Sequence, residues 1–315
     1  MDYSRADGKL YMMELEKQGE FAYQDFAHTD RLDNFTAMEV TLKTRCHGHQ
    51  FEGLAYPITP IGMHYLLIHY DIPKIDESTY RVRIEGLVKK PLSLDMVNIR
   101  SRPKVTIAST MECGGNGRMN QRYRLRLHVP WNNEAIGTAE WTGTPLRDIL
   151  NEAGIEEGAV DIVFTGLDKG IQGDKVQYFQ RALSLEQAMA PEVLLAYEIN
   201  GQTLPPQHGF PLRLIVPGWL GMTNVKWLSS IEVIPTKFTG LQMKWYSLAA
   251  NDDDPNRIPL THMKVRSLMI PPGVPDFFTR YRWLEETSTV ELRGRAWAGG
   301  TTIRVVHKSD VTLLL

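Results

Sequence analysis

The chain has 315 residues, of which 43% are hydrophobic and 23% are charged, so it has enough apolar surface for a folded core and is not a disordered chain. Its 35 basic and 37 acidic residues give a formal net charge of −2, which excludes the broad basic field that nucleic acids or anionic membranes require. The two cysteines, Cys46 and Cys113, exclude a disulfide scaffold, and at roughly 150 residues per domain the length predicts two domains.

Residues 1–50 are polar and of mixed charge, and we interpret them as an N-terminal extension. Asp2, Asp7 and Glu14 stand where a signal peptide would need an apolar stretch, and no apolar run is long enough for a membrane span. These features predict a cytoplasmic protein, or a periplasmic one if an export segment is missing from this sequence.

The middle of the chain predicts several strands and two well-marked helices. Thr144 as the cap, Pro145 in the first turn and Gly154 at the exit predict a helix over residues 144–154. Ser184 and Gln187 form the pattern of a capping box at the start of a second, short helix. Strands are predicted by alternation or by short apolar runs at residues 80–85, 104–110, 160–164, 193–197, 212–216 and 231–234.

These helices are few and do not alternate regularly with the strands, which favours a sheet-rich α+β fold over a doubly wound parallel sheet. We therefore predict a main domain at residues 51–250. The acidic, proline-flanked stretch at residues 251–259 is typical of a linker. Strands at residues 290–297 and 302–306 predict a second β domain at 260–315, and they are too few to close a β-sandwich.

Cys113 lies in the sequence MECGGNGR, residues 111–118, directly after a predicted strand. The glycines allow the backbone to approach a bulky partner, and Arg118 carries a charge that suits a thiolate or an anion. A lone thiolate suits a soft or high-valent metal that brings its other ligands with it. A tight turn with a buried structural cysteine is an equally good interpretation of the spacing alone.

Two further clusters carry polar groups. His208 and Arg213 flank a turn that enters a strand, and they also suit an anionic group. Lys226 precedes Trp227, which is consistent with a lysine lying on an aromatic ring or with a phosphate contact.

A third cluster, Cys46, His47 and His49, has the side chains of a metal site. A Rieske cluster would need a second Cys/His pair, which the chain lacks. We favour a polar loop for this segment.

Together these segments resemble the sulfite oxidase family of molybdopterin enzymes. The sequence MECGGNGR at 111–118 resembles the family's molybdenum-ligand loop, and residues 136–150, 194–218 and 224–228 resemble other family segments. The resemblance runs from about residue 52 to residue 246. A weaker likeness from His262 onward implies a shortened form of the family's immunoglobulin-like dimerisation domain.

The resemblance implies a molybdenum–molybdopterin cofactor, with Cys113 as the protein's thiolate ligand to the metal. Arg118 and Tyr246 match positions that line the family's oxyanion pocket, so they join Cys113 as the implied catalytic residues. The implied contacts to the cofactor are His69, Asp168, His208, Arg213, Asn224, Val225 and Lys226.

Two departures from the family pattern concern the pocket. Leu67 and Ile68 occupy the positions of a usual Arg-Asn pair, which removes a cation from the implied oxyanion pocket. Trp245 stands in place of a usual aspartate before the pocket tyrosine.

The expected activity is therefore oxo transfer between water and a small sulfur compound or oxyanion, with sulfite to sulfate first. Electrons would pass to an external acceptor such as a cytochrome, since the chain shows no haem or flavin segment. The resemblance also implies a homodimer. The alternatives are a reductase of sulfoxides or other oxyanions, a molybdopterin-binding protein without turnover, and a structural protein whose cysteine loop binds nothing.

Overall fold

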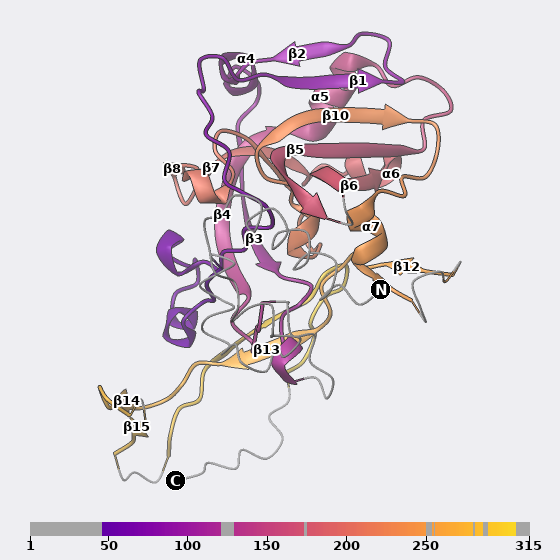
Figure 1. The fold of residues 1–315 in the computed structure, drawn as a ribbon. Helices are drawn as coiled ribbons and strands as arrows, with labels where there is room; N and C mark the ends of the chain where they lie inside the picture. Colours follow the sequence, from indigo (N-terminus) through magenta and orange to yellow (C-terminus); the bar gives the residue numbers. More distant parts are fainter. Residues whose placement is uncertain are drawn as a thin grey trace, which may run out of the picture.

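The computed structural model describes residues 46–120, 129–172, 175–249, 254, 256–279, 281–285 and 289–306. Two mostly antiparallel sheets form its centre, and short helices lie beside them (Figure 1). This arrangement confirms the prediction of a sheet-rich α+β fold. In the part of the chain that is described, no helix has the length and apolar character needed to cross a membrane.

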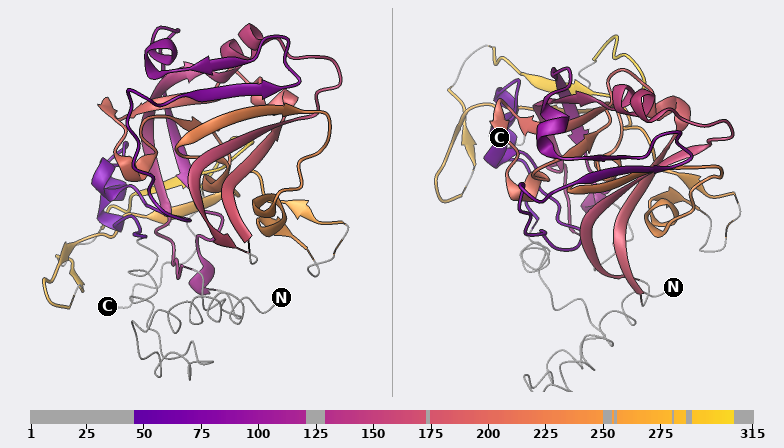
Figure 2. Two further views of the ribbon diagram at one scale, coloured as in Figure 1. Left: turned by 45° about the horizontal axis from the view of Figure 1, so that its top comes forward. Right: turned by 90° about the horizontal axis from the view of Figure 1, so that it is seen from above.

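The first sheet has the strand order β2-β1-β10-β5-β6, in which β1 and β10 are parallel and the other neighbours are antiparallel. In β1, Val82 and Ile84 are buried and Arg83 between them is exposed, as expected for a strand with one face on a core. The long pair β5 and β6 curves away from the rest of the sheet (Figure 2). The strands are β1 (Val82–Gly86), β2 (Leu92–Leu94), β5 (Asp161–Gln172), β6 (Lys175–Ser184) and β10 (Leu228–Ile234).

The second sheet has the order β3-β4-β7-β8, and β9 also pairs with β7. The register shifts between Thr142 and Gly143 in β4, where the added Cβ of any other residue would lie 2.1 Å from the carbonyl oxygen of Leu195. Gly143 therefore permits the close approach of β4 and β7. The strands are β3 (Val105–Glu112), β4 (Ile136–Pro145), β7 (Leu194–Ile199), β8 (Gln202–Thr203) and β9 (Arg213–Ile215).

The largest core lies between the two sheets and includes one face of helix α5 (Leu146–Ala153). Leu146, Ile149, Leu150 and Ala153 recur at helical spacing, and all four are fully buried. The other helices are short: α4 (Met96–Arg100), α6 (Leu185–Ala188), α7 (Leu241–Trp245) and the 3-10 turns η2 (Phe51–Ala55), η3 (Ile61–Met63), η4 (Arg118–Asn120), η5 (Pro206–His208) and η6 (Gly221–Thr223).

The helix termini agree with the sequence in two places and differ in one. The capping box is confirmed, because the backbone N–H of Gln187 donates to Ser184 Oγ and the Gln187 side chain accepts from the Ser184 N–H. Gly154 ends α5 with a φ of 70°, a conformation that suits glycine. The prediction that Thr144 caps α5 is wrong: strand β4 continues through Pro145, and the Thr144 hydroxyl donates to the carbonyl oxygen of Pro103 at 2.9 Å.

The C-terminal part forms two-stranded ladders, β11 with β12, β13 with β16 and β14 with β15. The strand predicted at residues 302–306 does not form, and the one at 290–297 is limited to four residues. Of the predicted linker, residues 258 and 259 form β12, while 251–253 and 255 lie outside the described residues, as do 1–45 of the N-terminal extension. The strands are β11 (Ser247–Leu248), β12 (Ile258–Pro259), β13 (Arg266–Met269), β14 (Val274–Pro275), β15 (Arg282–Trp283) and β16 (Gly294–Trp297).

Candidate functional site

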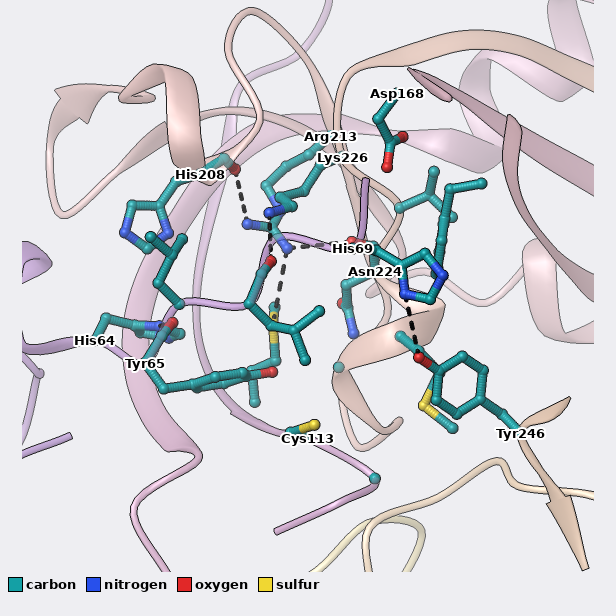
Figure 3. Close-up of a pocket in the computed structure, with 18 residues that line it drawn as sticks. His64, Tyr65, His69, Cys113, Asp168, His208, Arg213, Asn224, Lys226 and Tyr246 are labelled. Carbon is teal, nitrogen blue, oxygen red and sulfur yellow. Dashed lines mark hydrogen bonds between the residues drawn. The ribbon is translucent and has the colours of Figure 1, made fainter. Parts of the chain in front are cut away.

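A cavity lies where the ends of both sheets meet the segment that precedes β1, and it contains about 720 Å³ of empty space including its open mouth (Figure 3). Nine residues named from the sequence line this cavity: His69, Cys113, Asp168, His208, Arg213, Asn224, Val225, Lys226 and Tyr246.

Cys113 follows directly on β3, and its backbone N–H donates to the carbonyl oxygen of Ala135 at 3.0 Å. The N–H of Gly115 points to the Cys113 sulfur at 3.4 Å. Burial raises the pKa of the thiol, and this N–H and the charge of Arg118 partly oppose that rise. The thiol is therefore protonated in the free protein at neutral pH, and binding of its sulfur to a metal ion would lower its pKa and release the proton to solvent.

The loop that carries Cys113 is anchored by the neighbouring carboxylate of Glu112, which is almost fully buried. Asn116, within the loop, donates to Glu112 Oε1 at 2.9 Å, and Arg266 of β13 donates to the same oxygen at 2.7 Å. Trp297 of β16 donates through Nε1 to the other oxygen at 2.8 Å. Two strands from the C-terminal part therefore hold the start of the cysteine loop.

Arg213 of β9 supplies a buried cation at the end of the cavity opposite Cys113 (Figure 3). Its guanidinium donates to the carbonyl oxygens of His208 and Asn224 at 2.8 and 3.1 Å and lies over the ring of Trp141. Its Nε has no hydrogen-bond partner among the residues that the structure describes. Burial, together with nearby positive charge, lowers the pKa of His208 to about 2, so His208 is neutral.

Lys226 lines the cavity and also lies over the ring of Trp227, so the interpretation as a lysine on an aromatic ring is confirmed, and the phosphate contact stays a prediction. Its ammonium donates to the carbonyl oxygens of Leu67 and Gln207 at 2.8 and 3.1 Å and lies 4.3 Å from the centre of the Trp227 ring. Burial, assisted by Arg213, lowers the pKa of Lys226 to about 7, and burial raises that of Asp168 to about 7. A charged ligand in the cavity would therefore readily change the protonation of both Lys226 and Asp168.

Asn224 and Val225 line the cavity from the turn before β10, but their backbone N–H groups are already used. The N–H of Asn224 donates to Gly221 and that of Val225 to Thr223. The Asn224 side chain accepts from the N–H of Val216 at 2.7 Å. These residues shape the wall and do not present backbone donors to an anion.

His69 and Tyr246 form the remaining wall. The Tyr246 hydroxyl lies 3.5 Å from His69 Nδ1, and Gln172 Oε1 lies 3.1 Å from His69 Nε2. Burial lowers the pKa of His69 and raises that of Tyr246, so both are uncharged at neutral pH. Leu67, which the sequence resemblance matches to an arginine of the family, also lines the cavity, whereas Ile68 is buried and Trp245 is half-buried outside the cavity wall.

Arg118 does not line the cavity. Its guanidinium donates to the carbonyl oxygen of Val129 at 2.7 Å and lies against Gly115. Its charge still acts on the site, because it lowers the pKa of Cys113 and of Tyr246 against the larger effect of burial. In this conformation Arg118 is a neighbour of the loop and not a ligand-facing cation.

Sequence reasoning missed several wall residues, among them His64, Tyr65, Phe179 and Met222. His64 is the most informative of them, since it is fully buried and its Nε2 meets no hydrogen-bond partner in the described part of the chain. It lies in an irregular segment without a motif, so no sequence signal marked it.

The Cys46, His47 and His49 segment forms no helix or strand beyond a single bridge from His47 to Leu66; Cys46 and His49 are buried, and His47 is exposed. His49 Nδ1 is bound to the carbonyl oxygen of Met63 at 3.0 Å. Within the described ranges, no three His, Cys, Asp or Glu side chains are grouped in a way that would hold a metal ion.

Comparison with known proteins decides the family. A model of the oxidoreductase molybdopterin binding domain matches residues 69–242, more than half of the chain. The chain is 35% identical over 274 residues to sulfite oxidase of Arabidopsis thaliana, a match that covers 81% of this chain and 67% of that protein. This chain belongs to the sulfite oxidase family of molybdopterin-binding oxidoreductases.

Other members of the family extend this comparison. Sulfite oxidase of Gallus gallus is 33% identical over 278 residues, covering 81% of this chain and 56% of that protein. The chain thus spans between about half and two thirds of the length of these sulfite oxidases. The structure of the sulfane dehydrogenase SoxCD from Paracoccus pantotrophus matches with a TM-score of 0.60 and 27% identity, covering 70% of this chain and 55% of that chain.

The cavity fits the molybdopterin group on its own chemistry. A single thiol stands at one end, which suits a metal whose other ligands come from the cofactor. Two buried polar atoms of the wall have no hydrogen-bond partner among the described residues. Arg213 Nε is a donor and suits an anionic group, whereas His64 Nε2 is an acceptor, because Nδ1 of the neutral ring donates to the carbonyl oxygen of Tyr65 at 3.0 Å, and it suits a hydrogen-bond donor. Cys113 would hold the metal, and Arg213 and Lys226 would hold the negative charge of the pterin's phosphate.

Proposed function

We propose that this oxidoreductase oxidises a small sulfur compound by transfer of an oxygen atom that derives from water. The observation that carries the proposal is the joint placement of Cys113, the cation pair Arg213 and Lys226, and Tyr246 around one cavity. The sulfite oxidases and the sulfane dehydrogenase among its relatives support a sulfur compound as the substrate.

The cofactor, when bound, supplies the exchange of oxygen and of two electrons, and the chain's residues supply position and charge. Cys113 provides a thiolate on a loop that is anchored through Glu112. Arg213 and Lys226 provide positive charge in a buried environment, where electrostatic attraction is strong. Tyr246 provides a hydroxyl at the wall, and burial keeps that hydroxyl protonated.

The wall near Leu67 favours a substrate with little charge. Leu66, Leu67, Phe179 and Met222 bring apolar surface to the cavity where the family usually has an arginine. Lys226 lies beside Leu67 but is assigned, with Arg213, to the pterin's phosphate, so a dianion such as sulfite would lose hydration against this apolar surface without a cation of its own. We therefore place sulfite behind less charged sulfur compounds, and a sulfoxide reductase is the second candidate because the same apolar wall suits a neutral sulfoxide.

We further propose an external electron acceptor such as a cytochrome, and a homodimer as the assembly. Both proposals rest on the family alone and not on any contact in this structure. Stopped-flow reduction of a cytochrome and sedimentation of the purified protein would test them separately.

The direct experiment is expression in a host that makes the cofactor, followed by measurement of molybdenum and of turnover. Ferricyanide would accept electrons from sulfite, thiosulfate and organic thiols, and reduced viologen would supply them to sulfoxides. We expect about one molybdenum per chain and turnover with at least one sulfur compound. Protein that remains free of molybdenum in such a host would refute the cofactor assignment.

Cys113→Ser should lower turnover by more than about 100-fold, because a serine hydroxyl is a poor ligand for a soft metal centre. The matched control is Cys46→Ala, which removes the chain's other cysteine from a buried position outside the cavity wall and should retain turnover. Equal activity of the Cys113→Ser variant and the unaltered protein would contradict the assignment of Cys113 as the ligand. Molybdenum-loaded protein without turnover on the whole panel would favour a binding protein.

A further inference from the structure

A chain of hydrogen bonds behind the cavity wall has a direction that can be determined from its donors. It begins at the backbone N–H of Gln180, which can only donate and which points to Gln242 Oε1 at 3.4 Å. This contact assigns the oxygen of the Gln242 amide, so its Nε2 is the atom that faces the Tyr70 hydroxyl at 2.8 Å. Tyr70 therefore accepts from Gln242 and is left with its own proton to donate.

The Tyr70 hydroxyl lies 2.7 Å from Gln172 Oε1, the ordinary length of an O–H···O hydrogen bond. Gln172 Oε1 is thereby a carbonyl oxygen that accepts from Tyr70. The same oxygen lies 3.1 Å from His69 Nε2. Because an amide oxygen has no proton to give, His69 must carry its proton on Nε2.

A neutral imidazole has one proton, so His69 Nδ1 is then an acceptor. The atom next to it is the Tyr246 hydroxyl at 3.5 Å, as the dashed line in Figure 3 shows. The ring orientation is supported independently, since the flipped ring would place carbon atoms against both polar neighbours. The rings of Tyr70 and Phe179 pack edge-on against His69 with centroid distances of 4.5 and 5.0 Å and hold it in place.

We propose that Gln172 is a positioning residue that holds His69 in its Nε2–H form. The Tyr246 hydroxyl then donates a hydrogen bond to His69 Nδ1 and presents its lone pairs to the cavity. The inference goes beyond the proposed function, because it fixes what Tyr246 offers to a ligand. A ligand that meets this hydroxyl has to bring a hydrogen-bond donor, as water or a protonated oxyanion does, or the hydroxyl has to leave His69.

The charged groups around the relay favour its neutral form. Burial, and secondarily the charge of Lys226, lower the pKa of His69. Burial is also the main cause of the raised pKa of Tyr246, and the nearby charges of Arg118 and Arg181 only partly oppose it. Neither ring of the His69 and Tyr246 pair therefore ionises at neutral pH, and the choice of the protonated His69 nitrogen describes the state of the pair.

The test is nuclear magnetic resonance of full-length protein labelled with ¹⁵N-histidine, with the His69 signals identified by comparison with His69→Asn. Long-range proton–nitrogen correlations separate a protonated from an unprotonated ring nitrogen. We expect His69 to show a protonated Nε2 and an unprotonated Nδ1 between about pH 6 and pH 8. A protonated Nδ1, or a signal averaged between the two forms, would overturn the proposal.

Gln172→Leu should release the lock, so that the two His69 nitrogen signals move toward each other. Gln177→Leu is the matched control, because the Gln177 side chain donates to the backbone oxygen of Gln172 at 2.8 Å and has no recorded contact with His69. Gln172→Glu keeps both acceptor contacts, so it should retain the Nε2–H form and raise the pKa of His69. These readouts need no turnover, so their failure is distinct from a failure of the proposed activity.

Discussion

Replacing Glu112 with glutamine should destabilise the protein by about 3 kcal/mol, because the change removes a buried charge while its partner Arg266 stays in place. The Glu112 side chain is 3% exposed and that of Arg266 is 29% exposed, with 2.7 Å between Glu112 Oε1 and Arg266 Nη1. Breaking a buried ion pair from one side typically costs about 3–5 kcal/mol. Arg266 also donates to Asn116 and Asn133, so the lower end of that range applies.

A second cost comes from Trp297, whose indole N–H donates to Glu112 Oε2 at 2.8 Å. In the glutamine variant, the NH₂ group of the side-chain amide has to face either this indole N–H or the Arg266 guanidinium. In both orientations two hydrogen-bond donors face each other. Trp297→Phe removes this single bond to a charged group and should cost about 1.5–3 kcal/mol.

Urea unfolding of the cofactor-free protein, followed by circular dichroism, would measure these differences in the free energy of unfolding. The control is Glu291→Gln, because the Glu291–Arg293 pair is also 2.7 Å long but its side chains are 71% and 70% exposed. Its loss should leave stability almost unchanged, because both side chains are surrounded by water. Equal effects of the Glu112 and Glu291 substitutions would refute the argument that burial makes the first pair matter, and a double-mutant cycle with Arg266→Gln would isolate the pair itself.

Two further substitutions test the packing of the site and of the sheets. His64→Phe should make the stability of the protein less sensitive to acid. Burial lowers the pKa of His64 from 6.5 to about 4, so between these pH values the unfolded chain binds a proton and the folded chain does not. The free energy of unfolding of the unaltered protein should therefore fall by about 3 kcal/mol as the pH falls through that interval. If the urea midpoint falls by the same amount between pH 7 and pH 4.5 in the His64→Phe variant and in the unaltered protein, this argument is contradicted. Gly143→Ala should cost more than about 2 kcal/mol, because its Cβ would lie 2.1 Å from a backbone oxygen that cannot move freely. Gly62→Ala, with no atom within 4 Å of the added carbon, is its control in the same assay.

Local signals in the sequence were sufficient for much of the fold. The apolar spacing of α5 and the paired Ser184 and Gln187 define their helices, because these features depend on neighbours within one turn. The end of β4 could not be found in this way: Thr144 has the side chain of a cap, but it bonds instead to Pro103, about forty residues away in sequence. The strand predicted at residues 302–306 did not form, because alternation alone supplies no partner strand.

The site divides in the same manner. Nine of the ten residues inferred from the family pattern line one cavity, whereas Arg118 bonds to Val129 and leaves the wall. His64 and Gln172 carry no motif, and their importance comes from contacts between distant segments. The anchoring role of Glu112 likewise requires Arg266, which lies 154 residues later in the sequence.

The cavity walls come from residues as far apart in sequence as His64 and Tyr246, and they belong to both sheets. No shorter stretch of the chain contains the complete binding site for the cofactor. The cofactor therefore binds only after nearly all of this region has folded. A ligand held between the two sheets would then tie them together, and the loaded protein should unfold at a higher temperature and resist proteases for longer than the empty one. In cells that lack molybdenum, this protein would consequently be present in its less stable, cofactor-free form.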